Sequence, residues 1–344
     1  MKRWLIEASS AVALVFATVL PAIAVDTIKT ESDTLTGRIV AMTANEVTLD
    51  QNGIQQKVPV NKIEMISFGG DEPAALRTIR TYISEGRFQD AQSALERIQT
   101  SSVSRQEVKD EIAFLSAYVA ARVALESGGS ITEAGQQMAA FESGAPNNWH
   151  HWEAARIVGD LLMAVDKPAT AETYYQKLAQ APWPEYKLES NVLVGWAKLA
   201  AGKPGEAAAT FDAAVQLAGQ TAGADRLGVL ANIGKAQCLA EEGKTDEALA
   251  ILEPILARPD LADDAELAAR TYNAIGTAYR KANKPKDAVL AFLHVDLLYS
   301  QFAPGHITAL ENLVELWPQL QRPDRASRAA EVLRQRYGRT PPSG

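Results

Sequence analysis

Residues 268–292 read AARTYNAIGTAYRKANKPKDAVLAF, and this stretch decides the fold. Tyr272, Ile275 and Tyr279 follow one another at spacings of three and four residues, which places them on one face of a helix. Pro285 then marks the first turn of a second helix, because there its missing amide hydrogen has no intrahelical acceptor and its φ is already near the helical value. The stretch therefore predicts two consecutive helices joined by a short turn.

The pattern recurs along the chain at intervals of about 36 to 43 residues. A small residue early in the second helix is the clearest mark of each unit: Ala91, Ala134, Ala171, Ala207, Ala248, Ala288 and Ala326. Four positions later comes a residue that is mostly large and apolar: Leu95, Met138, Tyr175, Phe211, Leu252, Phe292 and Ala330. Four positions earlier, six of the seven units carry a basic residue: Arg87, Lys167, Lys203, Lys244, Lys284 and Arg322. Because such hairpins bury their apolar faces only against one another, the repeat predicts a stack of them.

Gly276, Tyr279, Ala288 and Phe292 resemble the small, aromatic, alanine and aromatic signature of the tetratricopeptide repeat (TPR) family. A second copy begins at Gly195, and weaker copies occur in the other units. The spacing averages about 39 residues, longer than the 34 of the family, which indicates longer helices or longer loops between units. The resemblance implies a mainly α fold, a TPR-like α-solenoid of about seven helical hairpins over residues 73–338.

Residues 1–24 are typical of a secretory signal peptide. Lys2 and Arg3 give a positive start, Ala11 to Leu20 is apolar, and Ala22-Ile23-Ala24 fits a small-x-small cleavage site. The apolar stretch is shorter than the roughly 20 residues that span a bilayer, although an uncleaved anchor stays an alternative. We therefore expect export to the periplasm or cell envelope, and at the other end of the chain a disordered tail over residues 339–344.

Short alternating apolar runs over residues 25–70 predict a small β-rich module. Asn52-Gly53 lies between two of these runs and is a hairpin turn signal, because both residues tolerate positive φ. The order of the runs resembles a small Sm-like barrel. We interpret the module as a cap or docking element for the helical array, because a fold alone does not define a function.

The TPR resemblance also implies a site, because arrays of this family bind a protein or peptide on a concave face lined by the first helices of the hairpins. The residues that the repeat phase places on that face are Arg156, Asp160, Val192, Trp196, Gln237, Arg270, Asn273, Thr277 and Arg280. Trp196 and the arginines are the best candidates, since aromatic and Arg anchors dominate interface energies. Packing of Trp196 between adjacent repeats is the alternative.

Composition argues against several functions. The chain has 344 residues with a net charge of -8 and no basic run, which argues against nucleic acid as its partner. Cys238 is the single cysteine and reads as a small buried hydrophobe. Trp149-His150-His151-Trp152 is the most unusual cluster, but adjacent helical residues face different directions, so we interpret it as an exposed aromatic turn and not as a metal site.

We therefore expect a non-catalytic scaffold or adaptor of the cell envelope or periplasm, without a cofactor. Its partner would be a protein or peptide. One alternative is an accessory factor for the secretion or assembly of an envelope polymer, in which the array contacts a membrane complex. Another is a hydrolase or metal-dependent enzyme that uses residues 149–152 or the β-rich module.

Overall fold

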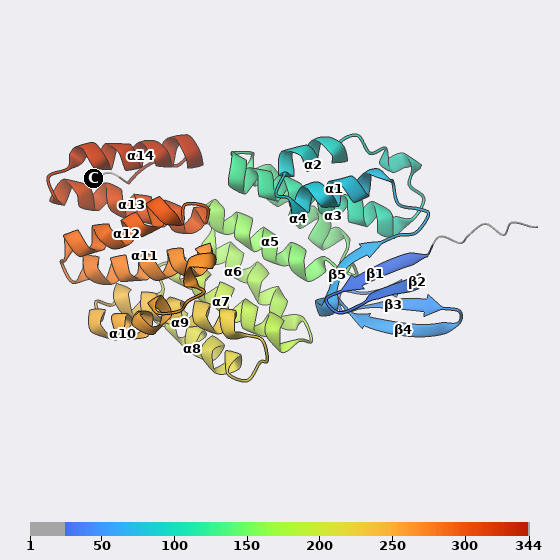
Figure 1. Ribbon diagram of the computed structural model, residues 1–344, viewed down its shortest axis with the longest axis horizontal. Helices are drawn as coiled ribbons and strands as arrows, with labels where there is room; N and C mark the ends of the chain where they lie inside the picture. Colours follow the sequence, from blue (N-terminus) through green and yellow to red (C-terminus); the bar gives the residue numbers. More distant parts are fainter. Residues whose placement is uncertain (1–24, 343–344) are drawn as a thin grey trace, which may run out of the picture.

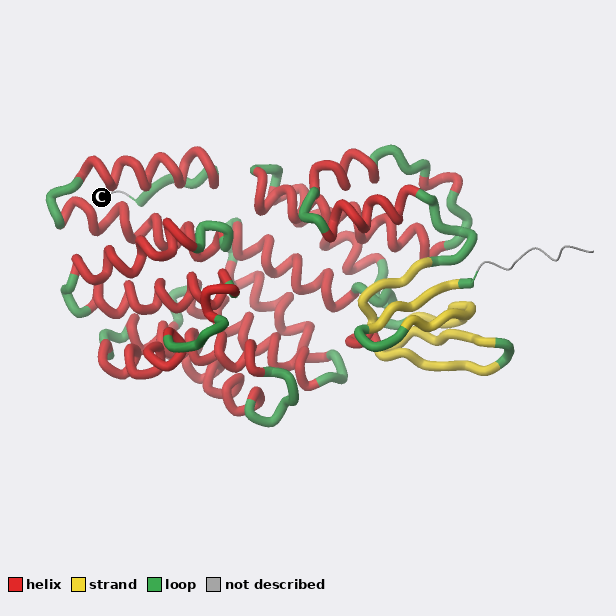
Figure 2. Tube along the Cα trace, viewed as in Figure 1, coloured by secondary structure: helices red, strands yellow, loops and turns green. Residues whose placement is uncertain are grey.

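The computed structural model describes residues 25–342, and the expected signal peptide lies outside them. A small antiparallel sheet comes first in the chain and a curved array of helices follows it (Figures 1 and 2). The helical array curls, so that its C-terminal helices approach its middle. Within residues 25–342, no helix combines the length and the apolar character that a bilayer crossing demands.

The sheet has five strands in the order β4-β3-β2-β1-β5, with every neighbouring pair antiparallel. The strands are β1 (Asp26–Thr30), β2 (Thr34–Met42), β3 (Glu46–Gln51), β4 (Ile54–Pro59) and β5 (Ile63–Ser67), with a 3₁₀ turn η1 (Val60–Lys62) before β5. Asn52 and Gly53 join β3 to β4 with φ of 56° and 86°. These angles are those of a tight primed turn, which confirms the predicted hairpin.

The helices of residues 75–337 form seven antiparallel pairs in chain order. The first three pairs are α1 (Ala75–Ser84) with α2 (Phe88–Leu95), α3 (Gln106–Ser127) with α4 (Ile131–Gly144), and α5 (His151–Ala164) with α6 (Pro168–Lys177). The next two are α7 (Pro184–Ala200) with α8 (Pro204–Ala218), and α9 (Asp225–Glu241) with α10 (Thr245–Leu256). The last two are α11 (Ala265–Lys281) with α12 (Pro285–Leu298), and α13 (Ala303–Gln319) with α14 (Pro323–Tyr337). Short 3₁₀ turns lie between pairs or after a second helix: η2 (Thr100–Ser102), η3 (Leu178–Gln180) and η4 (Leu261–Asp263).

One turn geometry joins the two helices in six of the seven pairs. The residue before the repeated basic residue has positive φ, as in Asn283 (56°) and Gly202 (73°). The basic residue then donates its backbone N–H to a carbonyl five residues back, as Lys284 does to Tyr279 at 2.9 Å. This is the Schellman closure of a helix C-terminus, and the next helix restarts at once, with proline in its first turn in four pairs. The repeated basic residue is therefore fixed just after the end of the first helix.

Glycine and aromatic residues determine how closely paired helices approach. A Cβ added to Gly276 of α11 would lie 2.6 Å from the Phe292 ring of α12, and one added to Gly195 of α7 would lie 2.6 Å from the Phe211 ring of α8. Both rings are fully buried. Because no real Cβ comes so close to another heavy atom, only glycine lets these rings lie against the facing backbone. The glycine noted in the sequence therefore packs against the aromatic ring that lies sixteen positions later in the same pair.

The sheet packs on the N-terminal half of the array through buried polar contacts. Arg105, just before α3, donates to both carboxylate oxygens of the buried Asp26 at 2.7 and 2.9 Å. Trp152 Nε1 of α5 donates to Asn45 Oδ1 at 3.1 Å, and Asn61 donates to Glu185 of α7 at 2.6 Å. The module therefore contacts the second, third and fourth helical pairs, the second through Arg105 just before α3.

The C-terminal segment folds back on the array. We expected a disordered tail from residue 339, but Arg339 Nη2 donates to the carbonyl of Ala164, at the end of α5, at 2.8 Å. Arg339 also lies 3.8 Å from Glu311 of α13. The curvature of the array brings the unpaired last carbonyls of α5 within reach, which explains why this residue is held.

We predict that replacing Gly195 or Gly276 with alanine lowers the free energy of unfolding by about 1–3 kcal/mol, because the new methyl group must displace a buried ring. Urea unfolding followed by circular dichroism measures the change. Gly205→Ala is the matched control: Gly205 is exposed in α8 with no atom near its Cβ position, so alanine there is neutral or slightly stabilising. Equal stability of all three variants would contradict the packing role of the glycines.

Candidate partner-binding hollow

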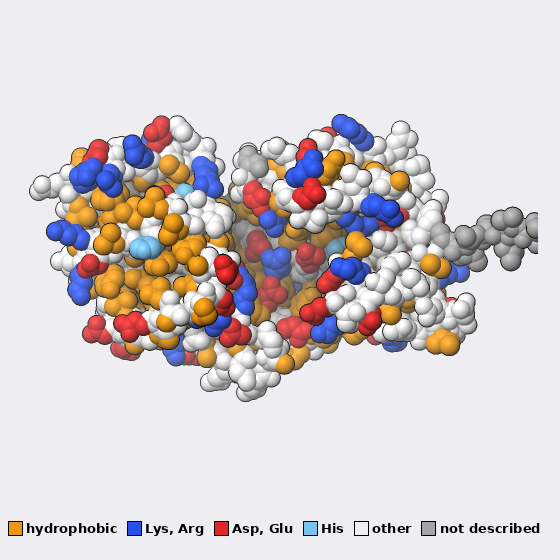
Figure 3. All heavy atoms as spheres, in the orientation of Figure 1, with side chains coloured by type: hydrophobic (Ala, Val, Ile, Leu, Met, Phe, Trp, Pro, Cys, Tyr) orange, Lys and Arg blue, Asp and Glu red, His pale blue; other side chains and the backbone are white. Residues whose placement is uncertain are grey.

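Charged side chains line a hollow at the middle of the array. Figure 3 shows the hollow between the N-terminal and C-terminal helices, with acidic and basic side chains gathered in it. The residues that we call the central hollow come from α5, α7 and α11, and each influences the ionisation of others in the set: Glu153, Arg156, Asp160, Glu189, Glu266 and Arg270. All six are half-buried. The concave side of the array is therefore a polar, partly desolvated surface.

The α5 side of the hollow is built around Arg156 and Asp160, one helical turn apart. Arg156 Nη1 donates to Asp160 Oδ2 at 3.0 Å, and Tyr175 donates its hydroxyl to Asp160 Oδ1 at 2.8 Å. Arg156 Nε lies 3.7 Å from Glu189 Oε1, too far for a hydrogen bond. Arg156 is thus committed mainly to Asp160, and Glu189 has only a longer-range ion pair.

Negative charge is in excess in this part of the hollow. Burial raises the pKa of Glu189, and although Arg156 acts against this, Asp160, Glu153 and Glu266 raise it further. The pKa of Asp160 is also raised, first by burial and then by Glu266, against the opposing effects of Arg156, Tyr175 and Arg270. Raised carboxylate pKa values mean that the ionised form is under-compensated.

The opposite side of the hollow holds an arginine between two aromatic rings. The Arg270 guanidinium lies 4.1 Å from the centroid of Trp196 and 5.1 Å from that of Phe302. Arg270 Nε donates to Glu266 Oε1 at 2.9 Å, and Arg226 of α9 donates to Glu266 Oε2 at 2.9 Å. Aromatic rings and a carboxylate therefore hold the Arg270 side chain in one position.

The structure brings four of the nine sequence-predicted residues to the hollow or its rim: Arg156, Asp160, Trp196 and Arg270. Trp196 is half-buried, and its ring meets that of Phe211 edge-on at 5.3 Å, so it packs between repeats as well as beneath Arg270. Its indole N–H has no hydrogen-bond partner in the described structure.

The other five predicted residues are buried or bonded to neighbouring repeats. Val192, Asn273 and Thr277 are only 2%, 7% and 2% exposed, so the expectation that they face a partner is wrong. Asn273 donates to the Gly305 carbonyl at 2.9 Å, because the close packing of α11 on α13 turns this face inwards. Gln237 donates to Thr277 at 3.1 Å, and Arg280 donates to Glu315 of α13 at 3.2 Å. These contacts tie neighbouring repeats together.

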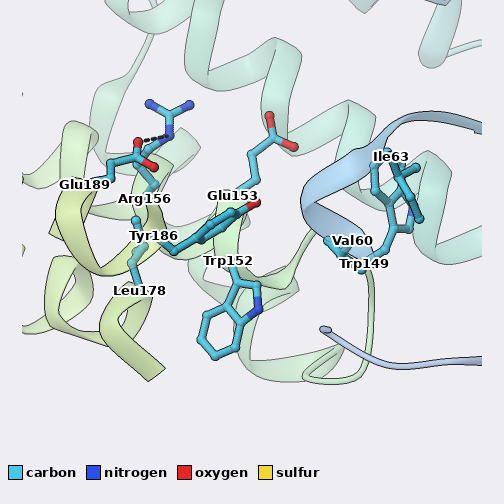
Figure 4. Close-up of a pocket in the computed structure, with 9 residues that line it drawn as sticks. All are labelled: Val60, Ile63, Trp149, Trp152, Glu153, Arg156, Leu178, Tyr186 and Glu189. Carbon is cyan, nitrogen blue, oxygen red and sulfur yellow. Dashed lines mark ion pairs between the residues drawn. The ribbon is translucent and has the colours of Figure 1, made fainter. Parts of the chain in front are cut away.

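A pocket of about 200 Å³ lies where the sheet meets the hollow. Its walls come from η1 and β5, from α5 and the turn before it, and from η3 and α7 (Figure 4). The lining combines aliphatic, aromatic and charged side chains: Val60, Ile63, Trp149, Trp152, Glu153, Arg156, Leu178, Tyr186 and Glu189. The pocket shares Glu153, Arg156 and Glu189 with the hollow, so the two form one continuous surface.

The expectation of an exposed aromatic turn at residues 149–152 is wrong. Trp149, His150 and Trp152 are 8%, 5% and 7% exposed, because the β-rich module covers this turn. His150 stacks on Phe114 at 3.5 Å between ring centroids. Its ring nitrogens contact Glu153 at 3.0 Å and Glu111 at 3.3 Å.

These contacts connect the hollow to a buried ion network. Arg80 Nη2 of α1 donates to Glu111 at 3.1 Å, and Glu111 in turn contacts His150. Burial opposes the charged form of His150, but hydrogen bonds with Glu111 and Glu153 outweigh it and raise the pKa of His150 above its ordinary 6.5. Burial raises the pKa of the Glu153 carboxyl, but the interactions with His150 outweigh this effect and the pKa is lowered. The raised pKa of His150 favours its charged imidazolium form.

Other candidate chemistry finds no support in residues 25–342. No group of three or more His, Cys, Asp and Glu side chains among them is arranged to hold a metal ion. Cys238 is buried, and burial raises the pKa of its thiol to about 12, so it is the small core residue that we predicted. His306 contacts Asp296 at 2.8 Å and the Tyr337 hydroxyl at 2.7 Å, in a buried pairing at the C-terminal end of the array.

Helix α12 carries a second surface that the sequence analysis did not single out. Leu290, Leu297 and Leu298 are exposed there, and His294 stacks on Tyr272 with 4.4 Å between ring centroids. Figure 3 shows apolar side chains gathered over this C-terminal part of the molecule.

Three of the four carboxylates of the hollow, Glu153, Glu189 and Glu266, were also missed, and so was the part that aromatic residues play in the pocket. Glu153 lies three positions before Arg156, and Glu189 lies seven positions before Trp196. Only the curl of the array brings these two carboxylates close together. Tyr186 and Trp152 reach the pocket because the sheet packs over the start of α5, and no periodicity reports that contact. The one signal available in the sequence was the presence of acidic residues, such as Asp160, on the predicted concave face of a first helix.

Comparison with known proteins supports the fold. No family model matches the sequence, and no curated protein does. A tetratricopeptide repeat protein from Parabacteroides merdae is similar in structure, with 14% sequence identity and a TM-score of 0.54 over 76% of this chain and 91% of that one. The Rap conjugation gene regulator of plasmid pLS20, solved in complex with the Phr* peptide, has 14% identity and a TM-score of 0.53 over 76% and 84%. A Rap protein complexed with Competence and Sporulation Factor has 14% identity and a TM-score of 0.51 over 74% and 72%.

These similarities and the repeat geometry define the class of fold. The described chain is a TPR-like α-solenoid preceded by a small five-stranded antiparallel sheet. The Sm-like character of the sheet stays an interpretation of its strand order.

We predict that His150→Gln destabilises the protein by about 2 kcal/mol near pH 6, because the change removes one of the two cationic partners of the buried Glu111 and leaves only Arg80. Because the folded-state pKa of His150 is raised, its contribution is complete below the unfolded value of about 6.5 and is lost as the pH rises through the folded value. The gap in stability between wild type and variant should therefore shrink towards pH 9. Urea unfolding of both proteins from pH 6 to 9 measures the gap, and a constant gap would show that the pKa of His150 is the same in the folded and unfolded states.

Proposed function

We propose that the chain is a non-catalytic scaffold that holds a protein or peptide partner in the central hollow. The observation that carries this proposal is the half-buried Arg270, held between Trp196 and Phe302 opposite the acidic face of α5. Arg and aromatic side chains that are already fixed bind at a small entropic cost, because their rotamers are ordered before the partner arrives. A curved solenoid presents such groups along an extended chain segment.

Two of the similar structures support a peptide as the partner. The Rap regulator of pLS20 is complexed with the Phr* peptide, and another Rap protein is complexed with Competence and Sporulation Factor. The fold of this chain is therefore one that accommodates peptides in other proteins. The partner itself is to be found by experiment.

The proposal includes an exported location. The positive start, apolar run and small-residue site of residues 1–24 are typical of a secretory signal peptide, and they support export to the periplasm or cell envelope. The net charge of -8 keeps nucleic acid out of the proposal.

We predict that Arg270→Ala and Trp196→Ala each weaken peptide binding by about tenfold or more, because each removes a pre-ordered anchor from the hollow. The ligands are peptides selected from a random library displayed on phage against the purified chain, and fluorescence anisotropy measures their dissociation constants.

Arg325→Ala is the matched control, because Arg325 makes the same kind of contact with Trp317, 4.9 Å from its ring centroid, in the last pair of helices. The turn between α13 and α14 lies at the far end of the array from the hollow (Figure 1). This control should bind as wild type does. A library that yields no binding peptide, or peptides that bind all three variants equally, would refute the proposed site.

A further inference from the structure

We propose that the pocket between the β-rich module and helices α5 and α7 binds a cationic group of the partner, the ammonium of a lysine or the guanidinium of an arginine. The inference rests on the proposed function, since the pocket opens into the same hollow, and it specifies the chemistry of one partner residue. Its basis is the charge, the aromatic lining and the size of the pocket (Figure 4).

The charge of the pocket is negative after internal pairing. Glu153 is matched by His150, and Arg156 is matched by Asp160 through a 3.0 Å hydrogen bond. Glu189 is then left with a 3.7 Å ion pair to Arg156 and no hydrogen bond within the described structure. A partly desolvated carboxylate of this kind gains more from an incoming cation than an exposed one, because the solvent screens it less.

The aromatic residues of the pocket suit the same ligand. Trp149, Trp152 and Tyr186 contribute to the lining, so a cation beside Glu189 would also meet aromatic rings. Trp149 is 8% exposed, and its indole N–H has no hydrogen-bond partner in the described structure. Trp149 is part of the pocket lining, so this unpartnered donor is a second observation at the pocket that is independent of the carboxylates.

The size of the pocket restricts the ligand to a single side chain. Its volume of about 200 Å³ is below the 300 Å³ or so at which pockets for small molecules begin. Val60 and Ile63 supply an aliphatic wall at the sheet, against which the methylene stem of lysine or arginine can pack. The β-rich module thereby contributes directly to the specificity of the array.

The test uses four blocked pentapeptides with a central lysine, arginine, norleucine or glutamate between alanine pairs, and unblocked pentaalanine as a source of a free amino terminus. Nuclear magnetic resonance shifts of the tryptophan indole N–H signals report binding to the full chain. We expect lysine or arginine peptides to bind about tenfold or more tightly than norleucine, which has the stem of lysine without its charge. Raising the salt concentration should weaken the binding of the cationic peptides alone.

Glu189→Gln removes the charge with almost no change in shape, and it should abolish the preference for the cationic peptides. Glu331→Gln, an exposed change of the same kind in α14, is the control and should keep the preference. Circular dichroism confirms that both variants fold. Equal binding of lysine and norleucine peptides, or a preference that survives Glu189→Gln, would overturn the inference while peptides from the phage library still bound.

The remaining outcomes are also decisive. One outcome is that pentaalanine competes with the lysine peptide for wild type and fails to bind Glu189→Gln. In that case the pocket binds a peptide amino terminus, and the assignment of a lysine or arginine side chain is wrong. If no pentapeptide shifts the indole signals at millimolar concentration, the cation pocket is refuted. Failure of the phage selection itself would instead refute the scaffold function.

Discussion

The contact between a buried aromatic ring and a glycine on the facing helix sets the geometry of this protein. Phe211 lies against Gly195 of its own repeat, and it also lies against Gly234 of the next, where an added Cβ would clash with the same ring. One side chain therefore fixes both the pairing of α7 with α8 and the stacking of α9 upon them. Since each repeat is positioned by its neighbour, small errors in this contact would accumulate along the array and change its curvature.

That curvature has an electrostatic consequence. It brings the acidic face of α5 towards Arg270 of α11, although five helices separate the two in the chain. Buried ion pairs add little to stability, because desolvation cancels much of their attraction. The row of buried and half-buried charges from Glu111 through His150 and Glu153 to Glu189 therefore adds little net stability, which agrees with the proposed role of the hollow in recognition.

The sequence predicted local structure well and distant contacts poorly. The repeated alanines, the prolines at helix starts and the Asn52-Gly53 turn all act within a few residues, so their patterns are legible in one chain. Four of nine predicted site residues reach the hollow or its rim, because repeat phase gives the first helix of each pair its concave side. Phase does not tell which residues on that side a neighbouring helix covers, and so Asn273 and Thr277 were misplaced. The burial of His150 was beyond prediction, because the sheet that covers it folds more than a hundred residues earlier in the chain.

The hydrogen bond between Arg339 and Ala164 bears on how the repeats of the array unfold. A linear solenoid behaves as a one-dimensional chain of units, in which the end repeats fray independently of the middle. Here the seventh repeat is tied to the third across 175 residues, so its fraying and the opening of the middle are coupled. The width of the hollow then depends on every repeat from the third to the seventh, and not only on the repeats that line it.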